Sequence, residues 1–199
     1  MTWHEYFKKI AEFTANKSTC VRLQVGAVLV KENRIISIGY NGVARNEEHC
    51  DAYFRKKWLN EKVDKFKEFK EYLASKEFYD EHGIFSNNNE IHAETNCLGF
   101  AAKSGTSTNG CELYLTDSPC TNCAKIILSA GIKAVFFNRK YDRDQNGIML
   151  LRQVGIVCNA IDFDNKAEVN IVLQTTEVEA HGIILPIKVE THDEQPLQE

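Results

Sequence analysis

The chain opens with apolar residues at helical spacing. Four large apolar side chains recur every third or fourth position: Trp3, Phe7, Ile10 and Phe13. This period predicts an amphipathic helix over residues 2–15. Two runs rich in β-branched residues, 25–30 and 34–40, then lie on either side of Lys31-Glu32-Asn33. They predict a β-hairpin.

A charge-rich segment follows at about residues 53–80, and its pattern is again helical. Its apolar side chains are spaced so that they lie along one side of one or two helices: Phe54, Trp58, Phe66, Phe69, Tyr72 and Leu73. The charged residues between them would face solvent. The segment is therefore interpreted as an inserted helical element.

From Glu90 onward, helical and strand patterns alternate. Helices are predicted at about 92–103, 120–130 and 145–154, and strands at 112–116, 133–137 and 156–161. Strands that alternate with helices of this length indicate βαβ units, and therefore a layered sheet with helices on its faces.

The last part of the chain has a different pattern. Two apolar runs, VNIVLQ and IILPIKV, flank His181-Gly182 and predict a further β-hairpin within about 168–190, followed by a polar tail. The expected organisation is one domain over 1–162, with the helical insertion, and a C-terminal extension over 163–199.

Composition narrows the class of protein. With 43% hydrophobic and 26% charged residues, the 199-residue chain is expected to be a globular protein with a sizeable core. The net charge of -4 gives no overall electrostatic attraction to nucleic acid. No apolar run approaches the roughly 20 residues that a membrane span needs, so no membrane association is expected.

The seven cysteines are the unusual feature. An odd number, in a chain that starts without a signal-like apolar run, argues against a secreted disulfide framework. A reducing, cytoplasmic setting is expected, in which cysteines bind metals, react or pack as small apolar groups.

Two short segments combine into a candidate metal site. They are His92-Ala93-Glu94 and Pro119-Cys120-Thr121-Asn122-Cys123. One imidazole and two thiolates make three protein ligands, which is typical of a catalytic zinc site whose fourth position holds water. Cys120 and Cys123 are three residues apart and share a helix face.

Glu94 is interpreted as a neighbour of the metal rather than a ligand. His92 and Glu94 are separated by about 200° around a helix, so both are poorly placed to reach one ion. If the ligand segments open two helices, the positive helix ends help to keep the thiolates deprotonated. A metal that activates water, beside a carboxylate that moves protons, suits attack on an electron-poor carbon.

The spacing resembles a known signature. The two segments match the H-x-E…P-C-x-x-C pattern of zinc-dependent nucleobase deaminases, so the chain resembles the cytidine/deoxycytidylate deaminase superfamily. Within it, the N-terminal half is similar to the dCMP deaminases of bacteria and their phages. This similarity rests on Ser18 to Val28, Gly39-Tyr40-Asn41-Gly42, His49-Cys50-Asp51 and Ile91 to Asn96.

The resemblance implies a fold and a reaction. The fold is a three-layer α/β/α structure with a central mixed sheet of about five strands, followed here by a C-terminal β extension. The reaction is hydrolysis of dCMP to dUMP and ammonia, which supplies dUMP for thymidylate synthesis. His92, Cys120 and Cys123 would hold zinc, and Glu94 would shuttle protons from water to the base.

Substrate contacts are also implied. The backbone around Ala93 and Ser118 would bond the edge of the base. Asn41 could form the strand-ending turn, bond a sugar hydroxyl, or do both. Arg22 is the first candidate for the 5′-phosphate because its planar guanidinium fits phosphate oxygens. Tyr141 is the second candidate.

Some phage members of the family carry an additional zinc ion. Cys20, His49, Cys50 and His82 fall where its ligands would be expected, and thiolates with imidazoles suit zinc. The alternative is that these residues are ordinary buried or surface groups. The remaining cysteines, Cys97, Cys111 and Cys158, are expected in the core.

The family also implies regulation and assembly. Members of this type are often homohexamers, activated by dCTP with magnesium and inhibited by dTTP. If the chain comes from a phage, it would act in the host cytoplasm.

Three alternatives remain open at this stage. A deaminase of tRNA adenosine or single-stranded DNA shares the zinc motif but usually carries a basic track with stacking aromatic residues. Riboflavin-pathway deamination is a weaker enzymatic alternative, because no second domain of reductase size follows. A zinc-stabilised module without activity is the non-enzymatic alternative, and such a module would not need Glu94.

Overall fold

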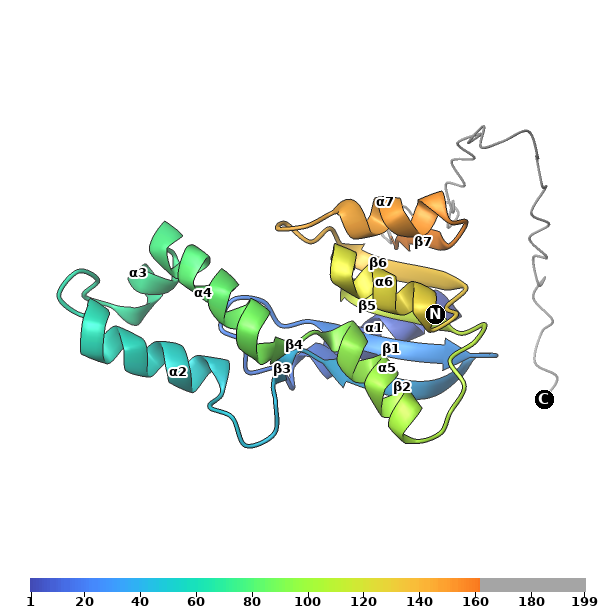
Figure 1. Ribbon diagram of the computed structural model, residues 1–199, viewed down its shortest axis with the longest axis horizontal. Helices are drawn as coiled ribbons and strands as arrows, with labels where there is room; N and C mark the ends of the chain where they lie inside the picture. Colours follow the sequence, from blue (N-terminus) through green and yellow to red (C-terminus); the bar gives the residue numbers. More distant parts are fainter. Residues whose placement is uncertain (162–199) are drawn as a thin grey trace.

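A five-stranded mixed sheet forms the centre of the molecule (Figure 1). The computed structural model describes residues 1–161. The strands lie in the order β2-β1-β5-β6-β7. Their bounds are β1 Gly26–Lys31, β2 Arg34–Tyr40, β5 Glu112–Asp117, β6 Ala134–Arg139 and β7 Val157–Ala160. β1 is antiparallel to both neighbours, whereas β5, β6 and β7 run parallel.

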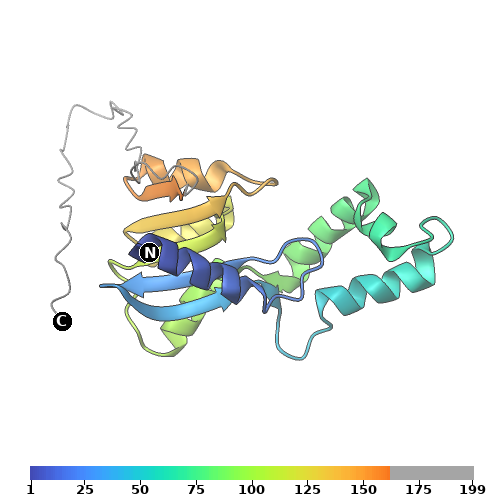
Figure 2. The same cartoon turned by 180° about the vertical axis from the view of Figure 1, so that it is seen from behind.

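Helices cover both faces of this sheet. Helix α1 (Trp3–Ala15) lies on one face, which Figure 2 shows toward the viewer. Helices α5 (Ala93–Lys103), α6 (Thr121–Ser129) and α7 (Asn146–Gln153) lie on the other. Alternate strand residues form the two apolar layers. Val28 and Tyr114 pack under α1, and Leu29 and Leu115 pack under α5 to α7. The predicted three-layer α/β/α fold is confirmed.

The predicted hairpin is present, with a shorter turn than the pattern suggested. Lys31 continues β1, and only Glu32 and Asn33 connect the strands. Both have positive φ values, 49° and 57°, which is the geometry of a two-residue turn that matches the twist of paired strands.

The inserted helical element forms a lobe that projects from the sheet (Figure 1). It contains α2 (Cys50–Lys57), a π-helical turn (Trp58–Lys62), α3 (Phe69–Leu73) and α4 (Lys76–Asn89). The two-stranded ladder of β3 (Gly42–Val43) and β4 (Glu90–Ile91) joins it to the body. The lobe has its own core of aromatic side chains, which includes Phe54, Tyr72, Phe78 and Phe85.

The helices of the lobe extend beyond the predicted 53–80. Helix α2 begins at Cys50, and α4 continues to Asn89 through a polar run that has no apolar period. Asn89 stabilises this last turn, because its side-chain amide donates to the carbonyl of Phe85 at 2.9 Å. A capping interaction of this kind leaves no hydrophobic signal in the sequence.

Helix α5 packs unusually close to β2, and this contact holds the start of α5 over the sheet edge. A Cβ atom at Gly39 would lie 2.4 Å from the backbone nitrogen of Cys97. Ser37 also donates from its hydroxyl to the carbonyl of Cys97 at 2.8 Å. Only glycine permits this approach, so Gly39 helps to place the residues that open α5.

The predicted C-terminal extension over 163–199, with its β-hairpin, lies outside the described residues. Within residues 1–161, no helix is both long enough and apolar enough to cross a membrane.

Candidate active site

Two helix starts meet at one edge of the sheet and bring three metal-binding side chains together. His92 is the N-cap of α5, and Cys120 is the N-cap of α6. The Nδ1 atom of His92 lies 3.6 Å from the Sγ atom of Cys120 and 3.4 Å from the Sγ atom of Cys123. All three potential ligand atoms lie within 4.8 Å of one another. Both segments therefore lie at helix starts, as their sequences predict.

The electrostatics of this cluster favour a cation. A hydrogen bond from Cys123 lowers the pKa of Cys120 to about 4, and the nearby His92 acts in the same direction. The same pairing raises the pKa of Cys123, and burial raises it further. The hydrogen bond with Cys120 raises the pKa of His92 to about 9, against the effect of burial. Two sulfur atoms and an imidazole that face each other at this distance are a donor set that fits zinc.

Glu94 is buried beside this cluster but does not belong to it. It lies in the first turn of α5 and is only 4% exposed. Loss of solvation raises the pKa of its carboxyl to about 7, although the charge of His92 lowers it. A carboxyl with this pKa can both accept and release a proton near neutral pH.

All of the predicted substrate residues border one cavity with the metal cluster. The cavity is lined by His92, Glu94 and Cys120, and also by the five substrate candidates: Arg22, Asn41, Ala93, Ser118 and Tyr141. These residues come from five separate parts of the chain. The spacing of these residues in the sequence does not predict that they meet at one cavity.

Asn41 shapes the loop that leads into β1. Its side-chain oxygen accepts from the backbone N–H of Val25 at 2.8 Å, and its amide group donates to the carbonyl of Leu23 at 3.0 Å. The side chain is only 6% exposed. The turn-forming role considered for Asn41 is therefore present, and the residue still borders the cavity.

Arg22 is held by an ion pair and by aromatic rings rather than lying free in solvent. Its Nη2 atom donates to both carboxylate oxygens of Asp142, at 2.7 and 2.6 Å. Its guanidinium carbon lies 4.9 Å from the ring centre of Tyr79 and 5.9 Å from that of Tyr141. Tyr79 comes from the inserted lobe, and sequence reasoning did not connect it with Arg22.

Ser118 and Tyr141 are locked to each other and to β6. The hydroxyl of Ser118 accepts from the backbone N–H of Tyr141 at 2.9 Å, and the backbone N–H of Ser118 donates to the carbonyl of Arg139 at 2.7 Å. The strand end that precedes Pro119 therefore has a defined backbone conformation at the cavity wall.

Comparison with known proteins agrees with this geometry. Residues 1–139 match the family model for the cytidine and deoxycytidylate deaminase zinc-binding region. The chain belongs to the cytidine and deoxycytidylate deaminase family. The deoxycytidylate deaminase of Enterobacteria phage T2 is 37% identical over 162 residues, which cover 74% of this chain and 86% of that protein. Its counterpart from phage T4 is 36% identical over 162 residues, with 74% and 84% covered.

A solved structure gives the same result. The dCMP deaminase from the cyanophage S-TIM5, in complex with dCMP and dUMP, is 30% identical to this deaminase. The match has a TM-score of 0.57 and covers 78% of this chain and 94% of the cyanophage chain. Family membership, which the H-x-E and P-C-x-x-C segments predicted, is confirmed.

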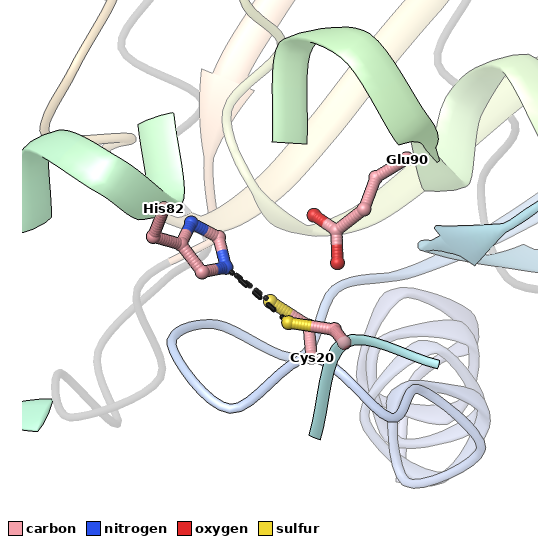
Figure 3. Close-up of side chains that lie close together, drawn as sticks. Cys20, His82 and Glu90 are labelled. Carbon is pink, nitrogen blue, oxygen red and sulfur yellow. Dashed lines mark hydrogen bonds between the residues drawn. The ribbon is translucent and has the colours of Figure 1, made fainter. Parts of the chain in front are cut away.

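The deaminase contains a second cluster of potential ligands at the base of the lobe. Cys20, Cys50, His82 and Glu90 place one ligand atom each within 4.8 Å of one another. The Nε2 atom of His82 lies 3.1 Å from the Sγ atom of Cys20 and 3.6 Å from that of Cys50. Figure 3 shows the carboxylate of Glu90 and the imidazole of His82 turned toward Cys20.

The predicted ligand His49 lies outside this cluster, and Glu90 takes its place. His49 precedes α2 as its N-cap and is exposed, with Nδ1 3.3 Å from the hydroxyl of Thr19. Cys50, the first residue of α2, is fully buried. Adjacent residues at a helix start point in different directions, so a ligand at Cys50 argues against one at His49.

This second donor set also fits zinc. A hydrogen bond with Cys50 lowers the pKa of Cys20 to about 3, and burial raises the pKa of Glu90. Within residues 1–161, the Oε1 atom of Glu90 is buried and has no hydrogen-bond partner. A buried carboxylate oxygen without a partner is costly, and a cation would satisfy it. Four protein ligands are typical of a closed, structural zinc site.

The segment that contains Asp144 and Gly147 packs against the turn that carries Cys120, a contact that the sequence does not predict. Asp144 accepts from the backbone N–H of Thr121 at 2.7 Å and from its hydroxyl at 3.0 Å. A Cβ atom at Gly147 would lie 2.1 Å from the carbonyl oxygen of Pro119 and 2.7 Å from that of Cys120. The start of α7 therefore supports the turn that presents Cys120.

The other cysteines are core residues, as predicted. Cys97, Cys111 and Cys158 are buried among the apolar side chains beneath α5, α6 and α7. All seven cysteines are free thiols, so no disulfide contributes to this fold.

Proposed function

We propose that this deaminase hydrolyses dCMP to dUMP and ammonia and thereby supplies dUMP for thymidylate synthesis. One observation carries the proposal. His92 and Cys120 of the three-residue metal-binding cluster, the buried carboxyl of Glu94 and the guanidinium of Arg22 border a single cavity. The cyanophage dCMP deaminase in complex with dCMP and dUMP, which shares the fold and 30% of the sequence, supports the choice of substrate.

His92, Cys120 and Cys123 would hold the zinc ion. When bound, zinc supplies a Lewis acid that lowers the pKa of a coordinated water molecule toward neutrality. The two helix starts contribute as well, because their positive ends favour the anionic form of the sulfur atoms.

Glu94 performs the proton transfers. It accepts a proton from the water that attacks C4 of the cytosine ring and delivers that proton to N3. It then moves the second proton to the departing amino group, so that dCMP and water give dUMP and ammonia. Because Glu94 is buried, its carboxyl exchanges protons with the substrate rather than with bulk water. A pKa near neutrality suits both transfers.

The remaining cavity residues orient the nucleotide. The backbone at Ala93 and Ser118 bonds the polar edge of the base, and Asn41 lies where a sugar hydroxyl can reach it. Arg22 binds the 5′-phosphate, because a guanidinium fork matches phosphate oxygens, and Tyr141 lies beside it.

A Glu94→Gln variant tests the mechanism. Turnover of dCMP should fall by about a thousandfold, because the amide cannot carry a proton. Zinc content and melting temperature should stay close to those of the wild type. Glu12→Gln, on the exposed side of α1, is the matched control and should keep full activity. Near-normal turnover in Glu94→Gln contradicts the mechanism.

A panel of substrates tests the specificity. Absorbance assays would compare dCMP with deoxycytidine, CMP, dCTP and a cytosine-containing oligonucleotide. We expect dCMP to be preferred, and the rate to fall when the 5′-phosphate is absent. Preference for the oligonucleotide would instead support a nucleic-acid deaminase.

The second cluster would hold a structural zinc ion through Cys20, Cys50, His82 and Glu90. Elemental analysis should find two zinc ions per chain, one for each cluster. Glu90→Gln should retain one, and His49→Gln should retain both. Loss of the second ion in His49→Gln would restore His49 as a ligand.

Family membership also suggests how the enzyme is regulated and assembled. We expect activation by dCTP with magnesium, inhibition by dTTP, and a homohexamer that acts in a host cytoplasm. Rates measured against dCMP concentration, with and without each effector, test the regulation. Sedimentation of the zinc-loaded protein tests the assembly.

A further inference from the structure

One aromatic side chain of the inserted lobe contacts an arginine that lines the substrate cavity. The ring of Tyr79, in α4, contacts two arginines of the body: the guanidinium carbon of Arg22 lies 4.9 Å from the ring centre, and that of Arg143 lies 4.1 Å away. Arg143 also donates to the carbonyl of Tyr79 at 2.5 Å. Tyr79 itself does not line the cavity, whereas Arg22 does.

The surrounding backbone leaves room for this arrangement. Gly83 lies one helical turn after Tyr79, and a Cβ atom there would come within 3.3 Å of the Nη1 atom of Arg143. The glycine therefore allows the arginine to lie flat against the lobe. This contact joins α4 to the loop that carries Tyr141 and Asp142.

Arg22 keeps donors for a ligand even while it is held in place. Both hydrogen bonds to Asp142 come from one nitrogen atom, Nη2. In the part of the chain that the structure describes, Nε and Nη1 make no hydrogen bond. The side chain of Arg22 is only 13% exposed, and Arg22 lines the cavity.

We propose that Tyr79 is a positioning residue for Arg22 and that it sets the preference for a nucleotide over a nucleoside. The inference rests on the proposed function, in which Arg22 binds the 5′-phosphate. A guanidinium stacked on a ring and tied to Asp142 is already oriented before the substrate arrives. Less conformational entropy is then lost when the phosphate binds.

Removal of the ring should therefore weaken phosphate recognition without affecting the chemistry. In Tyr79→Leu, KM for dCMP should rise by about tenfold, which is within the range of a partly buried cation–π contact. kcat for dCMP, and kcat/KM for deoxycytidine, should stay within about twofold of the wild type. Tyr79→Phe keeps the ring and should restore the wild-type KM for dCMP.

Two further variants separate this inference from the proposed function. Arg22→Gln should raise KM for dCMP at least as much as Tyr79→Leu, again without affecting deoxycytidine. Tyr6→Leu, at a half-buried tyrosine of α1 on the opposite face of the sheet, controls for general loss of packing and should leave KM unchanged. Zinc content and melting temperature confirm that each variant folds.

The outcomes are distinct. If the wild type does not deaminate dCMP, the proposed function fails. If Arg22→Gln affects dCMP selectively but Tyr79→Leu does not, the positioning role of Tyr79 is wrong. It is also wrong if Tyr79→Leu lowers activity equally on dCMP and deoxycytidine, or if Tyr79→Phe behaves like Tyr79→Leu.

Discussion

Single residues far apart in the sequence set the position of the proposed metal ligands. Gly147 shows this most clearly, because its Cα packs directly against the carbonyl groups of Pro119 and Cys120. A side chain at this position would push the turn that carries Cys120 away from His92. The geometry of the ligands determines the affinity for zinc. A glycine that keeps Cys120 in place therefore affects zinc binding in the same way as a hydrogen bond that orients a ligand.

We therefore predict that Gly147→Ala weakens zinc binding by about tenfold to a hundredfold, measured by competition with a chelator. Gly99→Ala is the matched control, because Gly99 is an exposed helical glycine whose added Cβ meets nothing within 4 Å. The control should bind zinc normally. Equal affinity in the two variants would mean that α7 does not support Cys120.

The residues of the candidate site were partly predictable from the sequence. The proposed zinc ligands and Glu94 lie in two compact motifs, and the spacing of those motifs at helix starts carries the chemical information. The contributions of Glu90, Tyr79 and Arg143 depend on the path of the lobe back to the sheet. No local pattern marks that path. His49 lies outside the second cluster, because sequence proximity to Cys50 does not determine which of two adjacent side chains points inward.

At the scale of elements, ion pairs tie the outer part of the lobe together. Lys62, in the π-helical turn, lies 2.5 Å from Glu77 and 2.9 Å from Glu81, both in α4. Hydrogen bonds from Lys62 and Lys65 lower the pKa of Glu77 to about 2. The pKa of Glu77 is lower in the folded protein than its usual value of 4.5. The pairing therefore stabilises the lobe fully at pH values above about 4.5, and this stabilisation is lost as the pH falls toward 2.

We predict that Lys62→Met makes the lobe unfold at a slightly lower denaturant concentration near pH 7, because the variant loses the pairing of Lys62 with Glu77 and Glu81. Denaturant titrations followed by tryptophan fluorescence measure this in a Trp3→Phe background, where Trp58 of the lobe is the remaining tryptophan. The difference between variant and parent should shrink between pH 4.5 and 2. A difference that stays constant over this range would show that the ion pairs are not its source.

Most elements of the body were predictable, because apolar periodicity and the βαβ alternation both point to the same layered sheet. The strands β3 and β4 were not, since two-residue strands are too short for any period to be visible. The end of α4 was missed for a different reason. Its last turn is polar, and a side-chain hydrogen bond from Asn89 stabilises it. Elements without a buried face leave little trace in a hydrophobic pattern.

At the scale of the whole molecule, the topology explains why both clusters form where they do. The parallel strands β5 and β6 end at one edge of the sheet, and α5 and α6 begin there, so their first residues converge. The ladder of β3 and β4 starts at the same edge. Glu90 in β4 belongs to the second cluster, and His92, two residues later, belongs to the first.

The second cluster therefore joins the lobe to the body. Its ligands come from the loop before β1, from the first residue of α2, from α4 and from β4. A metal ion that binds only the folded arrangement stabilises it by mass action. Loss of that ion should loosen the attachment of α2 and α4 while the three-layer body stays intact, because the body has separate apolar layers.

Hydrogen exchange can test this separation directly. In Glu90→Gln, amide protection should fall across residues 50–89 and stay unchanged in α6 and α7, since local opening exposes only the elements that the metal ties down. Cys120→Ser, which alters the catalytic cluster, should abolish turnover and leave the protection of the lobe as in the wild type. A uniform loss of protection in Glu90→Gln would mean that the second cluster stabilises the whole fold rather than the junction.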